Sequence, residues 1–87
     1  MTIVKPDKYL KPKISRRIIK FFIDNPSSID TPRGIATWIN ANVDETEKTL
    51  KKLTKAKILV SHGAGTTSAY GFTADANIVS AIKAAIK

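Results

Sequence analysis

The stretch from Ala41 to Thr73, ANVDETEKTLKKLTKAKILVSHGAGTTSAYGFT, restricts the fold more than any other part of the chain. In its first half, Thr46, Leu50 and Leu53 follow the i, i+4, i+7 spacing of one buried helical face. This spacing predicts a helix over about 44–56 whose opposite side, with several lysines, faces water. The second half has two β-rich runs around a glycine-containing loop, which predicts a β-hairpin directly after the helix.

The strands of this hairpin are predicted at about 58–62 and 69–73. The loop between them is longer than a tight turn requires, so residues 63–68 should form a projecting tip. Apolar spacing predicts three further helices, at about 13–24, 32–40 and 74–86. The fold class is therefore mainly α with a small antiparallel β-hairpin (α+β).

Residues with capping chemistry stand at the expected helix starts. Thr31, followed by proline, should cap the second helix. Asp44 should cap the third, with Glu47 completing a capping box, and Thr73 should cap the last. Residues 40–42, NAN, form the turn between the second and third helices, where asparagine tolerates a left-handed backbone.

Two apolar residues have a less certain place in this pattern. Trp38 shares a helical stripe with Ile35 and Ile39, so we expect it to be buried or half-buried. Ile29 is a lone apolar residue before the second helix, and it predicts either a one-residue strand or a plug in the core.

The first residues differ from the rest. Residues 1–12 are expected to form a basic arm in front of a single domain, 13–87, because two prolines prevent a continuous helix there. Tyr9 and Leu10 of this arm are apolar enough to dock on the domain.

Length and composition limit the remaining possibilities. A chain of 87 residues makes one small domain. It has no cysteine, which excludes disulfides and thiolate metal sites and fits a reducing compartment. No apolar run approaches the roughly 20 residues that span a bilayer, and the start lacks the apolar core of a signal peptide. The expected location is the cytoplasm.

Charge is the strongest indication of function. The chain has 15 Lys+Arg against 7 Asp+Glu, a net charge of +8. The basic residues gather in the first 20 positions and in the third helix. Clustered positive charge suits a polyanion, nucleic acid first and an anionic membrane surface second, although many basic domains carry such charge for solubility alone.

The order helix, helix, short turn, helix, hairpin, helix resembles the winged helix-turn-helix superfamily, especially small bacterial and archaeal transcriptional regulators. GIATWINANVDETEKTLKKLTKAKILV looks like the second helix, turn and recognition helix running into the first wing strand. AYGFTADANIVSAI looks like the return strand followed by a last helix. The resemblance covers about Ile14 to Ile86 and rests on apolar spacing.

The resemblance implies double-stranded DNA binding by a transcriptional regulator, with recognition helix 44–56 in the major groove. Wing 63–68 and arm 1–12 would follow the backbone. The residues that the resemblance places at the DNA are Glu45, Thr46, Lys48, Thr49, Lys52 and Lys55 on the recognition helix, Arg16, Arg17 and Arg33 on the preceding helices, and His62, Thr66 and Thr67 in the wing.

Small winged regulators often pair through terminal helices. The resemblance therefore implies a possible homodimer through Ile78, Val79, Ile82 and Ile86. Two alternatives remain open: a winged-helix protein–protein interaction module, and a non-specific architectural nucleic-acid binder that uses the basic arm.

No pattern supports catalysis or a cofactor. His62 is the single histidine, and a zinc site needs several ligands, so no metal is expected. The Gly-x-Gly of the hairpin loop lacks a P-loop lysine. Ser61 and Ser68 have no convincing pair of base and orienting group, so the sequence does not support nucleophilic catalysis. We expect a binding protein without enzymatic activity and without cofactors.

Overall fold

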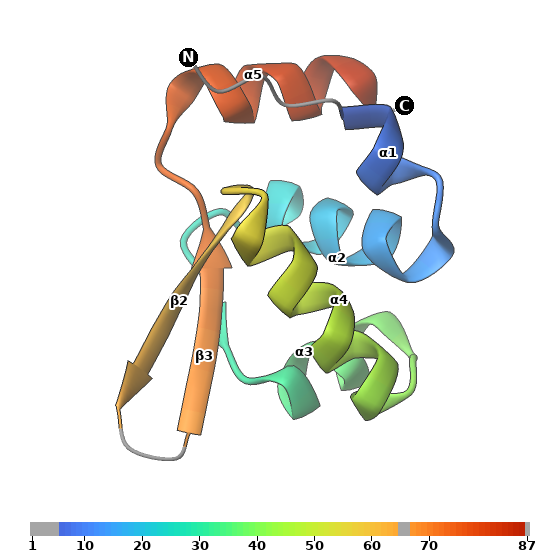
Figure 1. Cartoon of the computed structure of the whole chain (residues 1–87), viewed down its shortest axis with the longest axis vertical. Helices are drawn as coiled ribbons and strands as arrows, with labels where there is room; N and C mark the ends of the chain where they lie inside the picture. Colours follow the sequence, from blue (N-terminus) through green and yellow to red (C-terminus); the bar gives the residue numbers. More distant parts are fainter. Residues whose placement is uncertain (1–5, 65–66, 87) are drawn as a thin grey trace.

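The computed structural model describes residues 6–64 and 67–86 (Figure 1). The elements are, in chain order, α1 (Pro6–Leu10), α2 (Lys13–Asp24), β1 (Ile29–Asp30), α3 (Pro32–Ile39), α4 (Val43–Lys55), β2 (Leu59–Ala64), β3 (Thr67–Phe72) and α5 (Ala76–Ala85). The four predicted helices and two predicted strands are confirmed in type and order. Helix α1 and strand β1 are additional.

The sheet has three antiparallel strands in the order β1-β3-β2. Ile29 pairs with Gly71, and Leu59 pairs with Phe72 at the base of the hairpin. Of the two roles predicted for Ile29, a strand is the correct one, with two residues in place of one. This extra strand joins the start of the helix-turn-helix to the hairpin, so the two parts are held together by backbone hydrogen bonds.

The two faces of the sheet differ. Leu59 and Tyr70 point inward and are buried, whereas Val60 is 42% exposed and Ile29 is 57% exposed. This alternation is expected for an antiparallel sheet with one face on the core.

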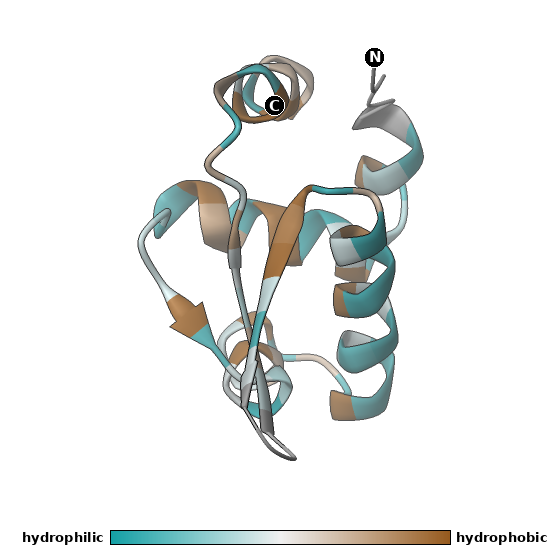
Figure 2. Cartoon of the chain, turned by 60° about the vertical axis from the view of Figure 1, so that its left-hand side comes forward, coloured by the Kyte–Doolittle hydropathy of each residue, from teal (hydrophilic) through white to brown (hydrophobic). Residues whose placement is uncertain are grey.

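Phe22 of α2 lies at the centre of the core and is fully buried. Its ring packs edge-to-face with Phe21 at 5.0 Å and stacks on Phe72 of β3 at 6.3 Å, so it joins helix to sheet. The buried core residues are Leu10, Ile18, Ile19, Phe22, Ile35, Ile39, Leu50, Leu53, Ile58, Leu59, Tyr70, Ile78 and Ile82. Figure 2 shows that the hydrophobic segments of α4 face the rest of the chain and its hydrophilic segments face outward.

The segment predicted as an arm contains helix α1, which packs on α2 and α5. Leu10 is buried in the core, and Tyr9 packs against it. The Ser15 hydroxyl of α2 donates a hydrogen bond to the Tyr9 carbonyl. Residues 8–10 are therefore part of the folded body, as the apolar character of Tyr9 and Leu10 allowed.

Two of the predicted caps are wrong. Helix α4 is capped by Asn42, whose side-chain oxygen accepts from the Glu45 N–H at 3.0 Å, so Asp44 lies inside the first turn. Helix α5 is capped by Asp75, which accepts from the Asn77 N–H at 2.9 Å, and Thr73 lies outside the helix. In both cases two cap-forming residues stand two positions apart, and packing of the following helix selects between them. The Thr31 cap of α3 is confirmed.

The prediction that Trp38 is buried or half-buried is also wrong, because its side chain is 72% exposed. Ile35, Ala36 and Ile39 fill the inner side of α3. They leave Trp38 at the edge of the helix, in contact with Phe21 at a ring distance of 6.0 Å.

Helix α4 ends in a Schellman motif with a strained residue. The Ile58 N–H bonds to the Leu53 carbonyl and the Lys57 N–H to the Thr54 carbonyl, both at 3.0 Å. Lys57 has φ 70°, in the left-handed region that favours glycine.

We expect Lys57→Gly to raise the free energy of unfolding by about 0.5–1 kcal/mol, as measured by urea denaturation. Asn40→Gly is the matched control: Asn40 has φ 55°, and asparagine tolerates this region, so its gain should be smaller.

Thr46 on the inner side of α4 is fully buried, and its hydroxyl has no hydrogen-bond partner among the residues that the structure describes. Burying a hydroxyl without a partner is unfavourable. Thr46→Val keeps the shape and removes the hydroxyl, so we expect the free energy of unfolding to rise by about 1 kcal/mol. Equal or lower stability of this variant in urea denaturation would contradict the prediction and indicate a buried water at the hydroxyl.

Candidate nucleic-acid interface

Helices α3 and α4 form a helix-turn-helix joined by residues 40–42. Asn40 has φ 55° and ψ 56°, which confirms the predicted left-handed turn, and the Ala41 N–H bonds back to the Ala36 carbonyl at 2.9 Å. The left-handed residue ends α3 and redirects the chain into α4. Leu50 and Leu53 then anchor α4 in the core, so its opposite side faces solvent.

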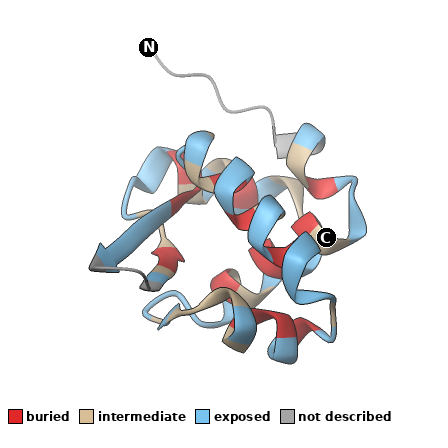
Figure 3. Ribbon diagram, turned by 60° about the horizontal axis from the view of Figure 1, so that its bottom comes forward, coloured by how far each residue is buried: buried red, intermediate tan, exposed pale blue. Residues whose placement is uncertain are grey.

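The outer side of α4 is divided by charge along its length. The exposed carboxylates are Asp44, Glu45 and Glu47, and the exposed ammonium groups are Lys48, Lys51, Lys52 and Lys55. The acidic first turns and basic later turns complement the helix dipole. In Figure 3 buried residues lie on the inner sides of the helices, and exposed residues form the outer surface.

A groove of about 530 Å³ lies between the start of α3, the side of α4 and strand β3. We call it the wing-side groove. It is lined by Thr31, Pro32, Arg33, Val43, Glu47, Lys51, Ser68 and Tyr70. The structure therefore brings predicted Arg33 beside Lys51, which the sequence did not single out as a contact. The i, i+4 spacing of Glu47 and Lys51 marks one side of the helix, but the sequence does not show that the hairpin lies there.

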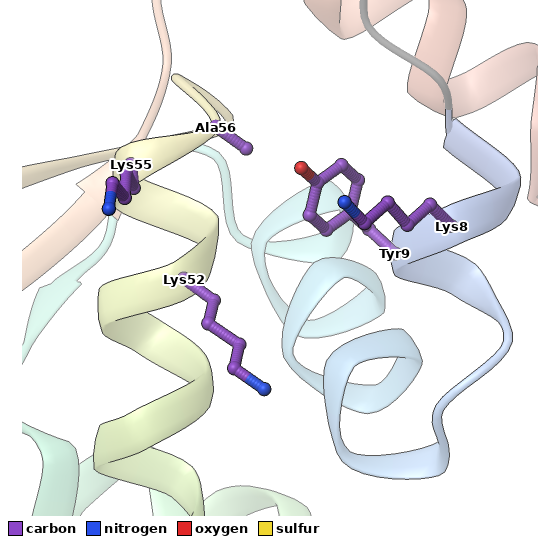
Figure 4. Close-up of a pocket in the computed structure, with 5 residues that line it drawn as sticks. All are labelled: Lys8, Tyr9, Lys52, Lys55 and Ala56. Atoms are coloured by element: carbon purple, nitrogen blue, oxygen red, sulfur yellow. The ribbon is translucent and has the colours of Figure 1, made fainter.

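A second groove, of about 410 Å³, separates α4 from α1. It is lined by Lys8, Tyr9, Lys52, Lys55 and Ala56. In Figure 4 Lys8 and Lys52 point into the gap, and Lys55 points away from it. The Lys8 ammonium lies 5.8 Å from the Tyr9 ring centroid. A basic residue of the predicted arm is thus placed beside the predicted recognition helix.

Several predicted contact residues lie elsewhere. Thr46 is fully buried and does not reach the surface, because it packs the inner side of α4. The half-buried Thr49 donates its hydroxyl to the Glu45 carbonyl at 2.8 Å. Arg17 donates to the Ile39 carbonyl at 3.3 Å, in a groove between α2 and α3 that shares no lining residue with the other two. Arg16, on the same helix, is half-buried.

In the hairpin, His62 is exposed on β2. Thr66 lies outside the described residues, and of Thr67 only the backbone, which begins β3, is described. The predicted loop at 63–68 is wrong in its length: Gly63 and Ala64 belong to β2 and pair with Ser68 and Thr67 of β3, because the antiparallel pairing continues beyond the predicted strands. The DNA contacts of Thr66 and Thr67 stay predictions.

Helix α5 uses much of its apolar stripe inside the chain. Ile78 and Ile82 are buried in the chain's own core, and Val79 and Ile86 are half-buried. The first two are therefore not available to a partner in this fold.

Among the described residues, no group of three or more His, Asp or Glu side chains is arranged to hold a metal ion. In the same part of the chain, no helix has the length and apolar character needed to cross a membrane.

Solved structures share this architecture at low sequence identity. The antimony-specific transcriptional repressor AntR superposes with a TM-score of 0.74 at 14% identity, covering 91% of this chain and 68% of that chain. The homodimeric winged helix-turn-helix DNA-binding domain of a possible ArsR-family transcriptional regulator from Mycobacterium bovis gives 0.71 at 15%, covering 91% and 69%. A possible transcriptional regulator from Methanosarcina mazei gives 0.66 at 16%, covering 93% and 78%.

These matches establish the fold: the chain is a winged helix-turn-helix, as the resemblance implied, with β2 and β3 as its wing. No protein-family model and no curated protein sequence matches the chain.

Proposed function

We propose that this chain binds double-stranded DNA as a transcriptional regulator, with α4 in the major groove and the hairpin beside it. The observation that carries the proposal is the wing-side groove, where Arg33, Lys51 and Ser68 line one open surface between α3, α4 and β3. A major groove about 12 Å wide admits one helix, and an adjacent β-ribbon then lies along the backbone. The described functions of the structural neighbours, a repressor and a DNA-binding domain, support the same role.

The lysines have different positions around α4. Lys48 and Lys51 lie on the outer and wing-facing sides, where they reach guanine acceptors or phosphates. Lys52 and Lys8 both point into the second groove from its two sides, and we propose that they bind a phosphate at the flank of the site. The net charge of +8 adds long-range attraction to the polyanion.

The acidic start of α4 limits how the helix can approach. Asp44, Glu45 and Glu47 are exposed, and phosphates would repel them. The first turn must therefore lie over base edges rather than over the backbone. In this orientation we propose that Glu45 accepts a hydrogen bond from a cytosine N4 group.

Selection from a random pool of DNA duplexes tests the proposal. The full chain should enrich a defined sequence, and a palindrome would add two-fold symmetry. Failure to enrich any sequence, combined with weak binding at low salt, would contradict sequence-specific DNA binding.

The double variant Lys8→Ala with Lys11→Ala tests the architectural alternative. A protein that binds DNA mainly through the basic arm loses most of its affinity in this variant, whereas a protein that binds through α4 keeps its sequence preference. Deleting residues 1–12 is unsuitable because Leu10 is buried in the core.

Dimerisation is part of the proposal. One of the structural neighbours is homodimeric. Because Ile78 and Ile82 are buried in this chain, a helix α5 contact would rest on Val79 and Ile86. Sedimentation of the protein with and without its selected duplex measures the oligomeric state directly.

We propose that the chain acts in the cytoplasm, where a transcriptional regulator meets its DNA. The proposed role requires only that its charged surface binds a polyanion, so we assign it no enzymatic activity.

A further inference from the structure

Trp38, the single tryptophan of the chain, is 72% exposed on α3. One part of its ring packs against Phe21, at 6.0 Å between ring centroids and an interplanar angle of 36°. Phe21 in turn touches the core through Phe22. A large aromatic side chain is therefore held on a rigid support but left mostly in water, which is typical of interaction sites.

The groove between α2 and α3 beside this ring, about 310 Å³, is called here the Trp38 groove. Its lining includes Arg17, Lys20, Phe21, Asp24, Trp38 and Ile39. Arg17 uses one guanidinium nitrogen to bond the Ile39 carbonyl and so is fixed at the groove. Two cations against one carboxylate make the rim positive. The groove thus has an apolar floor and a basic edge.

This surface is separate from the proposed DNA surface. The Trp38 groove shares no lining residue with the wing-side groove or with the groove between α1 and α4. Arg33 and Trp38 are five positions apart on α3, which places them about 140° apart around the helix. A partner at Trp38 can therefore bind while α4 holds DNA.

We infer that the Trp38 groove docks an acidic segment of a partner protein. One large apolar side chain of that segment packs against Trp38 and Phe21, and its carboxylates meet Arg17 and Lys20. A second copy of this chain fits less well, because each copy carries a net charge of +8. Duplex DNA fits less well because its phosphate backbone has no apolar group to pack against Trp38 and Phe21.

The experiment selects peptides from a library of random 12-residue sequences on the full chain, in parallel with Trp38→Ala. Enriched peptides should combine an aromatic residue or leucine with neighbouring Asp or Glu. A synthetic copy should change the emission of Trp38, which reports this site alone. We expect its affinity, measured by anisotropy of the labelled peptide, to fall at least about 30-fold in Trp38→Ala, as for an interface hot spot, and several-fold in Lys20→Glu. Lys83→Glu, an exposed change of equal charge on α5, should leave the affinity unchanged.

Affinity for the selected DNA should be the same in Trp38→Ala and wild type, so this result separates the docking surface from DNA binding. The inference is overturned if no peptide is enriched, or if Trp38→Ala enriches the same peptides. It is also overturned if Trp38→Ala loses DNA affinity as strongly as Lys51→Ala, or if it abolishes a homodimer seen by sedimentation. If circular dichroism shows that Trp38→Ala does not fold, the same comparisons are made with Lys20→Glu.

Discussion

Replacing Lys48 and Lys51 together by alanine will weaken binding to the selected duplex by on the order of 100-fold at moderate salt. Both ammonium groups are exposed on the outer half of α4, and Lys51 also lines the wing-side groove. A hydrogen bond to a charged group contributes about 1.5–3 kcal/mol, and the lower figure applies to exposed, screened side chains, so the loss of two such contacts costs about 3 kcal/mol, an effect of this size. Fluorescence anisotropy with a labelled duplex measures it.

The salt dependence identifies what each lysine contacts. The slope of log affinity against log salt should fall by about 0.9 for each phosphate contact removed. A change of about 1.8 in the double variant means that both lysines bind phosphate. A smaller change accompanied by relaxed sequence preference means that one of them reads a base.

The matched control is Lys20→Ala with Lys83→Ala, which removes the same charge from exposed positions on α2 and α5. It should lower affinity only slightly, through the reduced net charge. Equal losses in the control and test variants would show that binding depends on total charge and not on α4. Comparing Lys51→Ala with Lys52→Ala then shows which side of α4 faces the DNA, because these residues line different grooves.

Phe22→Ala will lower the free energy of unfolding by about 3–5 kcal/mol. Phe22 is fully buried and packs on Phe21 and Phe72, so its removal opens a cavity where α2 meets the sheet. A domain of this length has a total stability of roughly 4–13 kcal/mol, so the loss is a large fraction of it. Urea denaturation followed by circular dichroism gives the value.

Trp38→Ala is the appropriate control for this truncation. It also removes an aromatic ring, but from a side chain that is 72% exposed, so we expect a change within about 1 kcal/mol. If the two variants lose similar stability, Trp38 is part of the core in solution, and both the cavity argument and the exposed docking surface fail.

Local patterns in the sequence were sufficient for most of the architecture. The apolar spacing of Leu50 and Leu53 identified α4 and its inner side, because burial of one helical face depends on residues a few positions apart. The turn at 40–42, with an asparagine in the left-handed region, and the Thr31 cap are also local and were predicted correctly.

The incorrect or missing predictions all depend on long-range packing. The stripe that included Trp38 was read from its spacing to Ile35, but where the buried side of α3 ends is set by its contacts with α2 and α4. The two residues of β1 form a strand only because β3 is beside them. Lys51 was missed because only the fold shows on which side of α4 the hairpin lies.

Helices α1 and α5 pack together at the end of the molecule opposite the far ends of β2 and β3 (Figure 1). A flexible linker attached after α5 would therefore start away from the wing-side groove and the far ends of the hairpin strands. Two copies joined in tandem this way would give a single polypeptide whose two halves are free to orient on adjacent half-sites. The geometry thus makes the chain a convenient building block for synthetic repressors with chosen spacing.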